Sequence, residues 1–469
     1  MLPATLAQDV RKQVLHYLQA TFRLRDQATE QALETFFNDP ENGLFKGPWL
    51  QVRRPFRLDD SELSALFALP IPFVPFKHQA QSWRRLSSRG GQRPQSTLVT
   101  TGTGSGKTEC FLFPLVDHCL RMHQAGKRDG IKAIVLYPMN ALAADQGSRI
   151  AELIMTSEQL SDAVAGGRKA RVRVGLYTGR LSQGGGHEQG AEPGTYSEVT
   201  ARPGAGGGGW TYHPITNRAA MQADPPDILL TNYRMLDYLL LRPKDAGIWR
   251  HNQADPELLR YLVLDELHTY DGAQGADVAC LIRRLKSRFA MPRGQLCMVG
   301  TSATVAGGDD ETTLDPVHRL CEFASTLFEE LVTDEAVIQE DRYRVDEVVR
   351  TPALEVDALP SAGDCEPRPR EGAWQYAVRM AALFAGPRFP IAADDPGWPQ
   401  WAPRYASLRP QLEALDDAGR WGVALGEWLR WHPLFQRLLA ATAEAPGHWL
   451  ALLRALPGRG RADLRGLGL

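Results

Sequence analysis

Residues 97–108, TLVTTGTGSGKT, combine the residue types that bind a nucleotide phosphate. A β-branched, apolar run at 98–101 predicts a buried strand, glycines predict a tight turn, and Lys107 and Thr108 begin a helical pattern. In such a loop backbone N–H groups surround the anion, and the helix N-terminus adds favourable partial charge. We expect Lys107 to reach the β- and γ-phosphates and the Thr108 hydroxyl to hold Mg²⁺. The predicted nucleotide-binding residues of the loop are Thr101, Gly102, Thr103, Gly104, Ser105, Gly106, Lys107 and Thr108.

The loop departs from the strict phosphate-loop pattern at its first position, where Thr101 replaces glycine. The alternative interpretation is a glycine-rich turn that carries a lysine by chance. A carboxylate pair, Asp265 and Glu266, argues against chance because it directly follows the apolar run 261–264. Nucleotide hydrolysis needs such a pair: Asp265 to hold Mg²⁺ through its water shell, and Glu266 to orient and deprotonate the attacking water. The alternative for the pair is a surface cap on the following helix.

Gln79 lies in a helical stretch upstream of the loop. Its amide can accept from one group of an adenine edge and donate to another. It can equally be an ordinary surface residue of that helix, and its spacing from the loop leaves both interpretations open.

Strands and helices alternate along the chain and must position these side chains. Apolar runs predict strands at 98–101, 131–137, 171–177, 227–231, 261–264 and 296–299, with helical patterns between most of them. This alternation predicts an α/β fold with a parallel sheet, in which ligands bind at the carboxyl ends of the strands. Each motif follows a predicted strand, so we expect all of them at one edge of the sheet. The stretch 179–226 begins with a glycine-rich run and predicts a flexible insertion.

The composition sets limits on the class of protein. Apolar residues make up 43% and charged residues 23% of the chain, as in an ordinary soluble protein, and the net charge of −2 gives no global basic field. Basic clusters at 168–173 and 283–288 are either solvated faces or local phosphate tracks. No C-x-x-C pair is present, and we expect Cys110, Cys119 and Cys280 to be buried free thiols. No run of about 18 apolar residues occurs, so we expect a cytoplasmic protein with no membrane partner.

The order of the motifs resembles that of a known enzyme family. The sequences TGTGSGKT, DELH and SAT are similar to motifs I, II and III of superfamily-two DEAD/DEAH-box helicases. YPMNALAADQ and LLTNYRMLDYLL resemble the strand-contacting motifs of that superfamily. Together with LDELHTYDGAQGADVACLIRRL they most resemble the YprA-like group, which includes DNA-repair helicases and helicases of phage-defence systems such as DISARM and Druantia. The resemblance is strong from about Phe76 to Thr304.

The resemblance implies a RecA-like parallel sheet flanked by helices, with ATP and Mg²⁺ as cofactors and nucleic acid, DNA rather than RNA, as partner. It makes Gln79 the adenine reader, Lys107, Asp265 and Glu266 the catalytic residues, and Thr108 and Asp265 the Mg²⁺ ligands. It implies that His268, Ser302 and Thr304 couple hydrolysis to strand movement. The implied nucleic-acid contacts are Asn140, Gln146, Thr178, Gly179, Asn232 and Arg234.

The chain departs from this family in its last third. Two-lobed helicases carry a second RecA-like lobe with a Q-x-x-G-R-x-x-R-like motif, and residues 305–469 contain no such motif. We therefore expect a helical segment at 1–60, an ATP-binding helicase domain at 61–310 and a mostly helical, truncated accessory region at 311–469. On this view the chain is the front part of a longer enzyme, with weak hydrolysis of its own. The alternatives are an ATP-gated binding or regulatory module that does not unwind, or a fragment that needs a second lobe from another chain.

Overall fold

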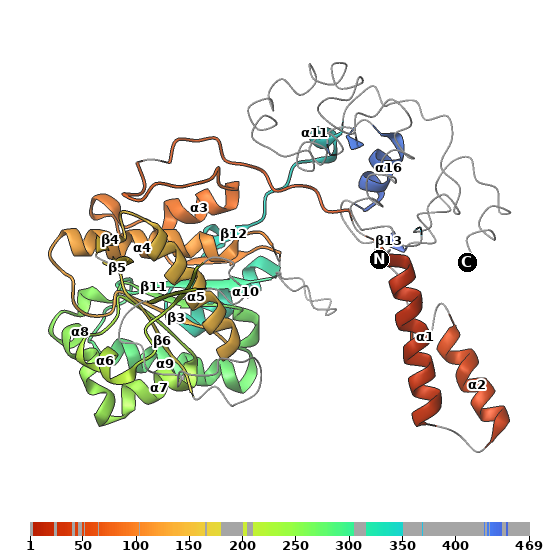
Figure 1. Ribbon diagram of the computed structural model, residues 1–469, viewed down its shortest axis with the longest axis horizontal. Helices are drawn as coiled ribbons and strands as arrows, with labels where there is room; N and C mark the ends of the chain where they lie inside the picture. Colours follow the sequence, from red (N-terminus) through yellow and green to blue (C-terminus); the bar gives the residue numbers. More distant parts are fainter. Residues whose placement is uncertain are drawn as a thin grey trace. The chain divides into compact units, whose positions relative to one another are not determined.

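The computed structural model describes most of the chain and divides into two compact units. The described residues are 3–22, 26–39, 43–45, 49–50, 52–63, 65–102, 104–164, 167–179, 200–203, 210–303, 316–349, 368, 426, 429–430, 432–442 and 447–448. One unit comprises Phe56–Asp341, and the other combines Met1–Pro55 with Arg342–Leu469. Both are drawn in Figure 1. The predicted boundaries at residues 60 and 310 stay a prediction; the compact unit continues to Asp341 because a late strand completes its sheet.

A seven-stranded parallel sheet forms the centre of the unit 56–341. Its spatial order is β12-β2-β11-β10-β3-β9-β6. The predicted α/β fold with a parallel sheet flanked by helices is confirmed. The inner strands are apolar along their length and buried on both faces, as strands covered by helices on each side must be. The bounds are β2 Thr97–Thr100, β3 Ala133–Leu136, β6 Val174–Tyr177, β9 Ile228–Thr231, β10 Tyr261–Leu264, β11 Cys297–Ser302 and β12 Val337–Gln339.

Helices cover both faces of this sheet (Figure 1). Right-handed crossovers place α4 and α5 on one face, with α3 packed against α4, and α7, α9 and α10 on the other. The bounds are α3 Lys77–Leu86, α4 Lys107–Gln124, α5 Asn140–Thr156, α6 Arg218–Ala223, α7 Tyr233–Leu241, α8 Arg250–Ala254, α9 Gly272–Arg288 and α10 Pro316–Phe328. Short 3-10 turns lie at η1 Arg89–Gly91, η2 Pro243–Trp249, η3 Pro256–Leu258, η4 Leu267–Thr269 and η5 Asp334–Ala336. The core lies between the helices and the sheet.

Part of the predicted flexible insertion is packed structure, which corrects that expectation. Strands β7 (Thr200–Pro203) and β8 (Trp210–His213) form an antiparallel hairpin, and α6 follows within the same stretch. Strand β8 lies beside α5, and Tyr212 packs against the main core. Tyr212 supplies apolar surface that the glycine content of the stretch concealed. A second hairpin, β4 (Ser161–Val164) with β5 (Gly167–Ala170), was not predicted either. Residues 180–199 and 204–209 lie outside the described residues.

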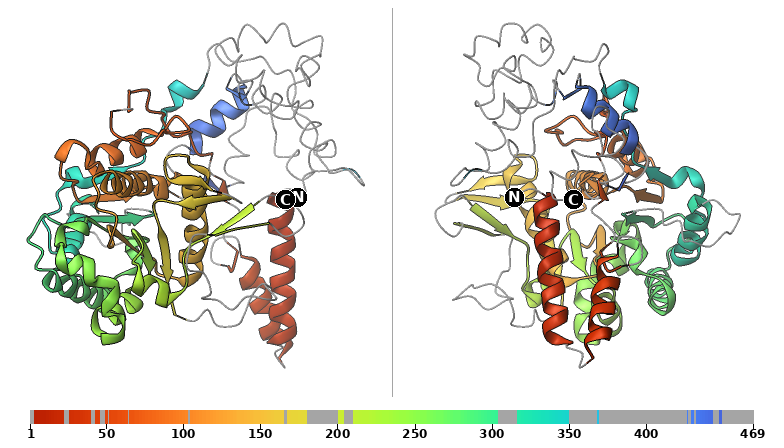
Figure 2. Two further views of the ribbon diagram at one scale, coloured as in Figure 1. Left: turned by 60° about the vertical axis from the view of Figure 1, so that its left-hand side comes forward. Right: turned by 90° about the vertical axis from the view of Figure 1, so that its right-hand side faces the viewer.

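The other unit contains the predicted N-terminal helices. Helices α1 (Pro3–Thr21) and α2 (Gln27–Asn38) run alongside each other in both views of Figure 2, and Arg11 Nη2 donates to Asn38 Oδ1 over 2.8 Å. The same unit holds α11 (Val345–Val348), α16 (Pro433–Thr442) and the antiparallel pair of β1 (Trp49–Leu50) with β13 (Gly447–His448). Most of the accessory region predicted at 311–469 lies outside the described residues. None of the described helices is both long and apolar enough to cross a membrane.

Candidate nucleotide site and nucleic-acid interface

The glycine-rich loop joins the end of β2 to the start of α4. Gly104 and Gly106 have φ values of +81° and +73°, in the left-handed region that favours glycine. At Gly106 an added Cβ would also lie 2.3 Å from Gln79 Nε2, so a side chain there would displace the Gln79 amide. The hydroxyls of Thr101 and Ser105 lie 2.6 Å apart and close the base of the loop. Thr103 lies outside the described residues.

Helix α3 holds the loop by its carbonyl groups. The ring Nε2 of His78 lies 2.8 Å from the Ser105 carbonyl oxygen, and Gln79 Nε2 donates to the Gly106 carbonyl over 3.3 Å. Trp83 donates its indole N–H to a carbonyl in the first turn of α4 over 2.8 Å. His78 and Gln79 bind carbonyls of the loop and Trp83 binds a carbonyl of α4, so none of the three side chains occupies a backbone N–H group that an anion could use.

Gln79 is buried, so it is not an ordinary surface residue of its helix. Its Oε1 accepts from the Phe76 N–H over 2.9 Å, while its Nε2 contacts the loop. Both ends of the amide are therefore engaged within the protein, and its reading of adenine stays a prediction. The sequence did not predict the roles of His78 and Trp83. Neither the residue types nor their spacing indicates a hydrogen bond to a backbone carbonyl 26 or 27 residues away.

The carboxylate pair lies at the end of β10, opposite the loop. Lys107 Nζ is 3.7 Å from Glu266 Oε1, so the phosphate-binding lysine and the predicted base meet across the edge of the sheet. Thr301, fully buried on β11, donates its hydroxyl to Asp265 Oδ1 and accepts from the Glu266 N–H over 3.2 Å. Glu266 has a φ of +51°, a conformation that non-glycine residues rarely adopt. Its side chain makes no helix-capping bond, which removes the surface-cap interpretation.

Burial is the largest influence on Asp265 and raises the pKa of its carboxyl above the usual range. The negative charge of Glu266 adds to this rise, whereas the Thr301 hydrogen bond and the charge of Lys107 oppose it. The ionised form of Asp265 is therefore destabilised by its surroundings, and a nearby positive charge would stabilise it. A divalent cation supplies such a partner, and Mg²⁺ takes one or two protein oxygen ligands plus waters and substrate phosphates.

The described residues fit that kind of cation site. The Thr108 hydroxyl makes no hydrogen bond to another residue in the described part of the chain, and it lies at the start of α4 beside Lys107. Within that same part no group of three or more His, Cys, Asp or Glu side chains is arranged to hold a metal on its own. Asp265 and Thr108 would thus supply two ligands and leave the others to waters and phosphates.

His268 and Ser302 lie beside the carboxylate pair. His268 Nδ1 is 3.5 Å from Glu266 Oε2 and 3.4 Å from the Ser302 hydroxyl, so one imidazole bridges the ends of β10 and β11. This side chain is 51% exposed and has room to move. Ser302 is the last residue of β11, which extends three residues beyond its predicted end. Thr304, the third predicted coupling residue, lies outside the described residues.

Three of the predicted nucleic-acid residues follow neighbouring strands on the other half of this edge. Asn140 begins α5 after β3, Asn232 precedes α7 after β9, and Thr178 follows β6. Asn232 Nδ2 donates to Asn140 Oδ1 over 2.7 Å, and Asn232 Oδ1 accepts from the Met235 N–H over 2.8 Å. Gly179 follows Thr178, and an added Cβ there would meet no atom within 4 Å. These residues form an accessible row of amide and hydroxyl groups beside the carboxylate site.

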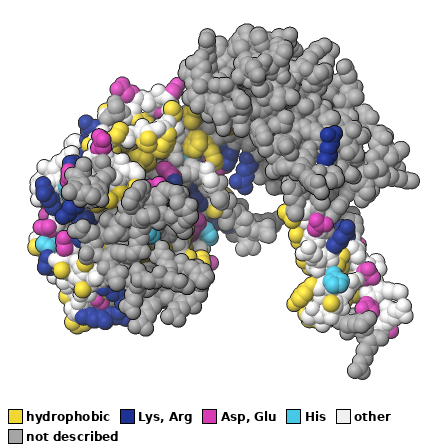
Figure 3. Space-filling view, in the orientation of Figure 1, with side chains coloured by type: hydrophobic (Ala, Val, Ile, Leu, Met, Phe, Trp, Pro, Cys, Tyr) yellow, Lys and Arg dark blue, Asp and Glu magenta, His cyan; other side chains and the backbone are white. Residues whose placement is uncertain are grey.

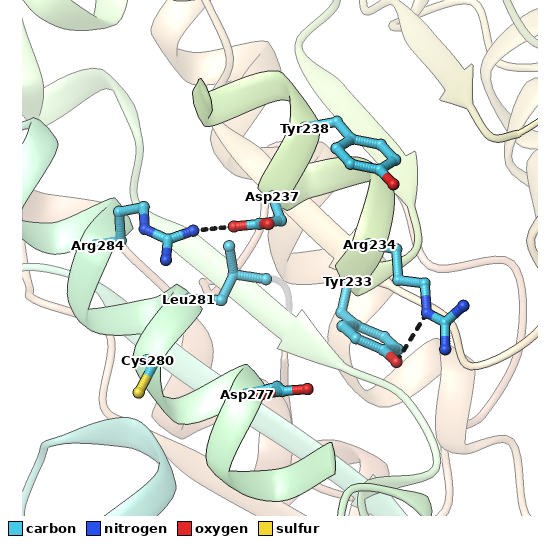
Figure 4. A pocket seen from close by; sticks show the side chains of 8 residues that line it. All are labelled: Tyr233, Arg234, Asp237, Tyr238, Asp277, Cys280, Leu281 and Arg284. Atoms are coloured by element: carbon cyan, nitrogen blue, oxygen red, sulfur yellow. Dashed lines mark hydrogen bonds and ion pairs between the residues drawn. The ribbon is translucent and has the colours of Figure 1, made fainter. Parts of the chain in front are cut away.

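The other two predicted residues lie on helices. Gln146 is half-buried on α5, and its Oε1 has no hydrogen-bond partner among the described residues. Arg234 lies on α7, and its Nε donates to the Tyr233 hydroxyl over 3.0 Å. Arg234 and Tyr233 line a hollow of about 310 Å³ between α7 and α9, in which Arg284 pairs with Asp237 (Figure 4). Cys280 opens into the same hollow and is exposed, so its predicted burial is wrong; Cys110 and Cys119 are buried as predicted.

Charged side chains are interspersed on this unit. On the face in Figure 3, Lys and Arg side chains alternate with Asp and Glu over the described residues of the unit 56–341. This agrees with the net charge of −2.

Comparison with known proteins adds the family. The family model for DEAD/DEAH box helicases matches residues 76–179 and 207–311, which include the loop, the carboxylate pair and the row of amides. The chain contains a DEAD/DEAH box helicase domain. The helicase domain is similar to Druantia protein DruE of Escherichia coli (strain UMEA 4076-1), with 33% identity covering 50% of this chain and 16% of that protein. It is also similar to the uncharacterized ATP-dependent helicase YprA of Bacillus subtilis (strain 168), with 27% identity, 46% of this chain and 21% of that one.

The chain therefore spans about a fifth or less of the length of these two relatives. Among solved structures, the DUF1998 helicase MrfA bound to DNA aligns with 21% identity and a TM-score of 0.40, covering 66% of this chain and 32% of that one. The predicted resemblance to DEAD/DEAH-box helicases and the YprA-like group is confirmed.

Proposed function

We propose that the helicase domain binds Mg·ATP, hydrolyses it and couples hydrolysis to binding of a nucleic-acid strand. In this proposal Lys107 holds the phosphates, while Asp265 and Thr108 hold Mg²⁺, which neutralises phosphate charge during the reaction. Glu266 orients the attacking water and accepts its proton. Gln79 reads adenine, and His268, Ser302 and Thr304 transmit the state of the phosphate site.

One observation carries this proposal: Lys107 Nζ lies 3.7 Å from Glu266 Oε1, although the two residues belong to β–α junctions far apart in the sequence. Hydrolysis of a phosphoanhydride requires a cation for the phosphates and a base for the water at one place. The buried Thr301 hydroxyl supports it, because it fixes the orientation of both carboxylate residues. The ion pair also keeps Lys107 within the site before a nucleotide arrives.

The first test measures nucleotide binding and turnover. Calorimetric titration with Mg·ATP should show binding by the unchanged protein and loss of affinity in Lys107→Ala, because the variant lacks the phosphate contact. Glu266→Gln should retain affinity but not turnover. Equal affinity in the lysine variant, or undiminished turnover in the glutamine variant, would sink the proposal.

We further propose that Asn140, Thr178, Gly179 and Asn232, with Gln146 and Arg234, contact the backbone of a single strand, with DNA as the biological partner. The positions of these residues support the proposal. Amide and hydroxyl groups lie in a row beside the coupling residues, and such groups suit contacts with a nucleic-acid backbone that do not depend on sequence. Binding of a fluorescent oligonucleotide should weaken steeply with salt and depend little on sequence. Absence of binding at low ionic strength contradicts this part.

The wider role is also a proposal. We propose a cytoplasmic helicase or translocase lobe that works with a second RecA-like lobe, in DNA repair or phage defence. The similarity to a Druantia protein supports defence. The part of the chain that the structure describes contains one sheet of this kind, and directional stepping needs two alternating grips. We therefore expect slow hydrolysis without unwinding until a second lobe supplies an arginine, a contribution of about 10³–10⁵ in rate.

A further inference from the structure

A carboxylate already occupies one donor of the phosphate loop. The N–H of Gly102 donates to Glu340 Oε2 over 2.9 Å. Glu340 directly follows β12, which pairs with β2 so that Gln339 lies opposite Thr100. Parallel pairing thus brings Glu340 to the same edge as the loop, 238 residues away in sequence. Sequence reasoning missed this residue, because β12 itself was not predicted.

A carboxylate on such a loop resembles the ligand that the loop is built to bind. Phosphate oxygens and carboxylate oxygens are both anionic acceptors and compete for the same N–H donors. Two anions close together also repel each other, and that repulsion is large where water is partly excluded. Glu340 in its present position therefore lowers the affinity of the loop for a nucleotide. This holds even if the phosphates bind mainly to other N–H groups of the loop, because the two negative charges still repel each other.

We infer that Glu340 tunes nucleotide affinity by holding the phosphate loop when it is empty and by leaving the Gly102 N–H when a nucleotide phosphate binds. The inference rests on the proposed function, since it assumes that the loop binds a nucleotide. It adds a residue that lowers affinity, whereas Lys107 and Thr108 raise it.

Asp341, the residue after Glu340, connects this segment to helix α3. Asp341, the last residue of the unit 56–341, accepts from Arg57 Nε at 3.2 Å and from Lys77 Nζ at 2.6 Å. Lys77 is the first residue of α3, and its N–H donates to the Arg57 carbonyl over 2.8 Å. The segment 340–341 is thereby attached both to the phosphate loop and to the helix that holds this loop. Release of Glu340 changes the restraint on the segment through which the chain leaves the unit.

The experiment compares Glu340→Ala and Glu340→Gln with Glu335→Gln. Glu335 is exposed and precedes β12, so its replacement makes the same change in charge at the opposite, amino-terminal edge of the sheet. Affinities for Mg·ATP and Mg·ADP are measured by calorimetry. We expect Glu340→Ala to bind Mg·ATP about tenfold more tightly than the unchanged protein, since one charge-assisted hydrogen bond no longer competes. Mg·ADP, with less negative charge, should gain less, Glu340→Gln should be intermediate, and Glu335→Gln should match the unchanged protein.

Hydrogen exchange gives the second readout. Mg·ATP should accelerate backbone exchange in residues 337–343 of the unchanged protein, while it protects the loop, and Glu340→Ala should show fast exchange there without nucleotide. Unchanged or weaker ATP affinity in Glu340→Ala, or slower exchange of 337–343 on binding, overturns this inference alone. If the unchanged protein and both Glu340 variants bind no nucleotide, the proposed function falls and this inference falls with it.

Discussion

The two halves of the sheet's carboxyl edge are built differently. In the half formed by β2, β11 and β10, buried hydroxyls hold the site together: Thr101 bonds to Ser105, and Thr301 bonds to both carboxylate residues. The half formed by β3, β9 and β6 presents Asn140, Asn232 and Thr178 half-exposed. A fixed arrangement suits a reaction whose rate depends on charges held in place. Accessible amides suit a strand backbone that must bind and leave.

The largest effect should come from Glu266→Gln, which tests whether catalysis is confined to the buried half. We expect ATP hydrolysis to fall by about 10²–10⁴-fold, because the amide cannot accept the proton of the attacking water. Oligonucleotide affinity should stay unchanged. Steady-state ATPase and fluorescence anisotropy measure the two. Glu257→Gln, an exposed position before β10, is the control; equal loss of turnover in both variants would contradict the assignment.

Thr301→Val should give the next largest effect. It tests the hydrogen bonds that Thr301 makes to Asp265 and to the Glu266 N–H. The valine cannot orient Asp265 and leaves the Glu266 N–H without its acceptor. Residues that orient a metal ligand typically contribute 10–100-fold, so we expect at least about a tenfold rise in the Mg²⁺ concentration needed for half-maximal ATPase. Thr301→Ser keeps the hydroxyl and should restore the Mg²⁺ dependence. A serine variant as defective as the valine variant would show that packing, not the hydroxyl, is what matters.

Asn232→Ala tests the accessible half and should have a smaller effect. Losing one amide contact should weaken oligonucleotide binding by about 2–10-fold, while ATP affinity stays the same. Because Asn232 also caps α7, the variant should lose about 1 kcal/mol of stability. Asn217→Ala removes an equivalent cap from α6 and serves as the control for that loss. Equal oligonucleotide affinities in the two variants would remove Asn232 from the interface.

The smallest effect should be a gain in stability from Asp265→Asn. The folded pKa of Asp265 lies above its unfolded value, so the folded chain holds this proton more tightly. Its contribution to the free energy of unfolding therefore falls as pH rises from the unfolded pKa, about 3.9, through the raised folded pKa. Above that window the ionised group is a constant penalty, which asparagine removes. Thermal unfolding without nucleotide should show a higher midpoint for Asp265→Asn at neutral pH than at acid pH, relative to the unchanged protein. Asp277→Asn, on the exposed surface of α9, should show no such difference.

Sequence patterns predicted the parts of the structure that are locally encoded. Six of the seven sheet strands lie in mostly apolar stretches long enough to recognise, and the loop and carboxylate motifs each lie within a few consecutive residues. Strand β12 has three residues and no periodicity, so only its pairing with β2 identifies it. Likewise, Thr301 lies beyond the predicted end of the sixth strand at residue 299, yet β11 includes it, and pairing of β11 with β10 and β2 decides its burial.

The supporting residues escaped prediction for the same reason. His78 and Glu340 form hydrogen bonds to the backbone of the loop, and Trp83 forms one to a backbone carbonyl of α4, the helix that follows it. Many polar side chains can make such bonds, so the residue type does not predict them. Which side chains reach the loop or α4 is determined by the tertiary fold. The flexible insertion was overpredicted because its glycines outweighed four aromatic or β-branched positions of the hairpin.

The position of β12 also affects how the protein is made. Strand β2 has β11 and β12 as its neighbours, and Thr100 and Ile338 are 238 residues apart. At roughly 5–20 residues per second, a ribosome needs tens of seconds to supply that second neighbour after β2 has emerged. Until β11 emerges, the strand before the phosphate loop has unpaired backbone groups on both sides, and until β12 emerges it has them on one side. Unpaired strands of this kind are where nascent chains associate wrongly. Newly synthesised copies should depend on chaperones during translation more than the stability of the finished sheet suggests.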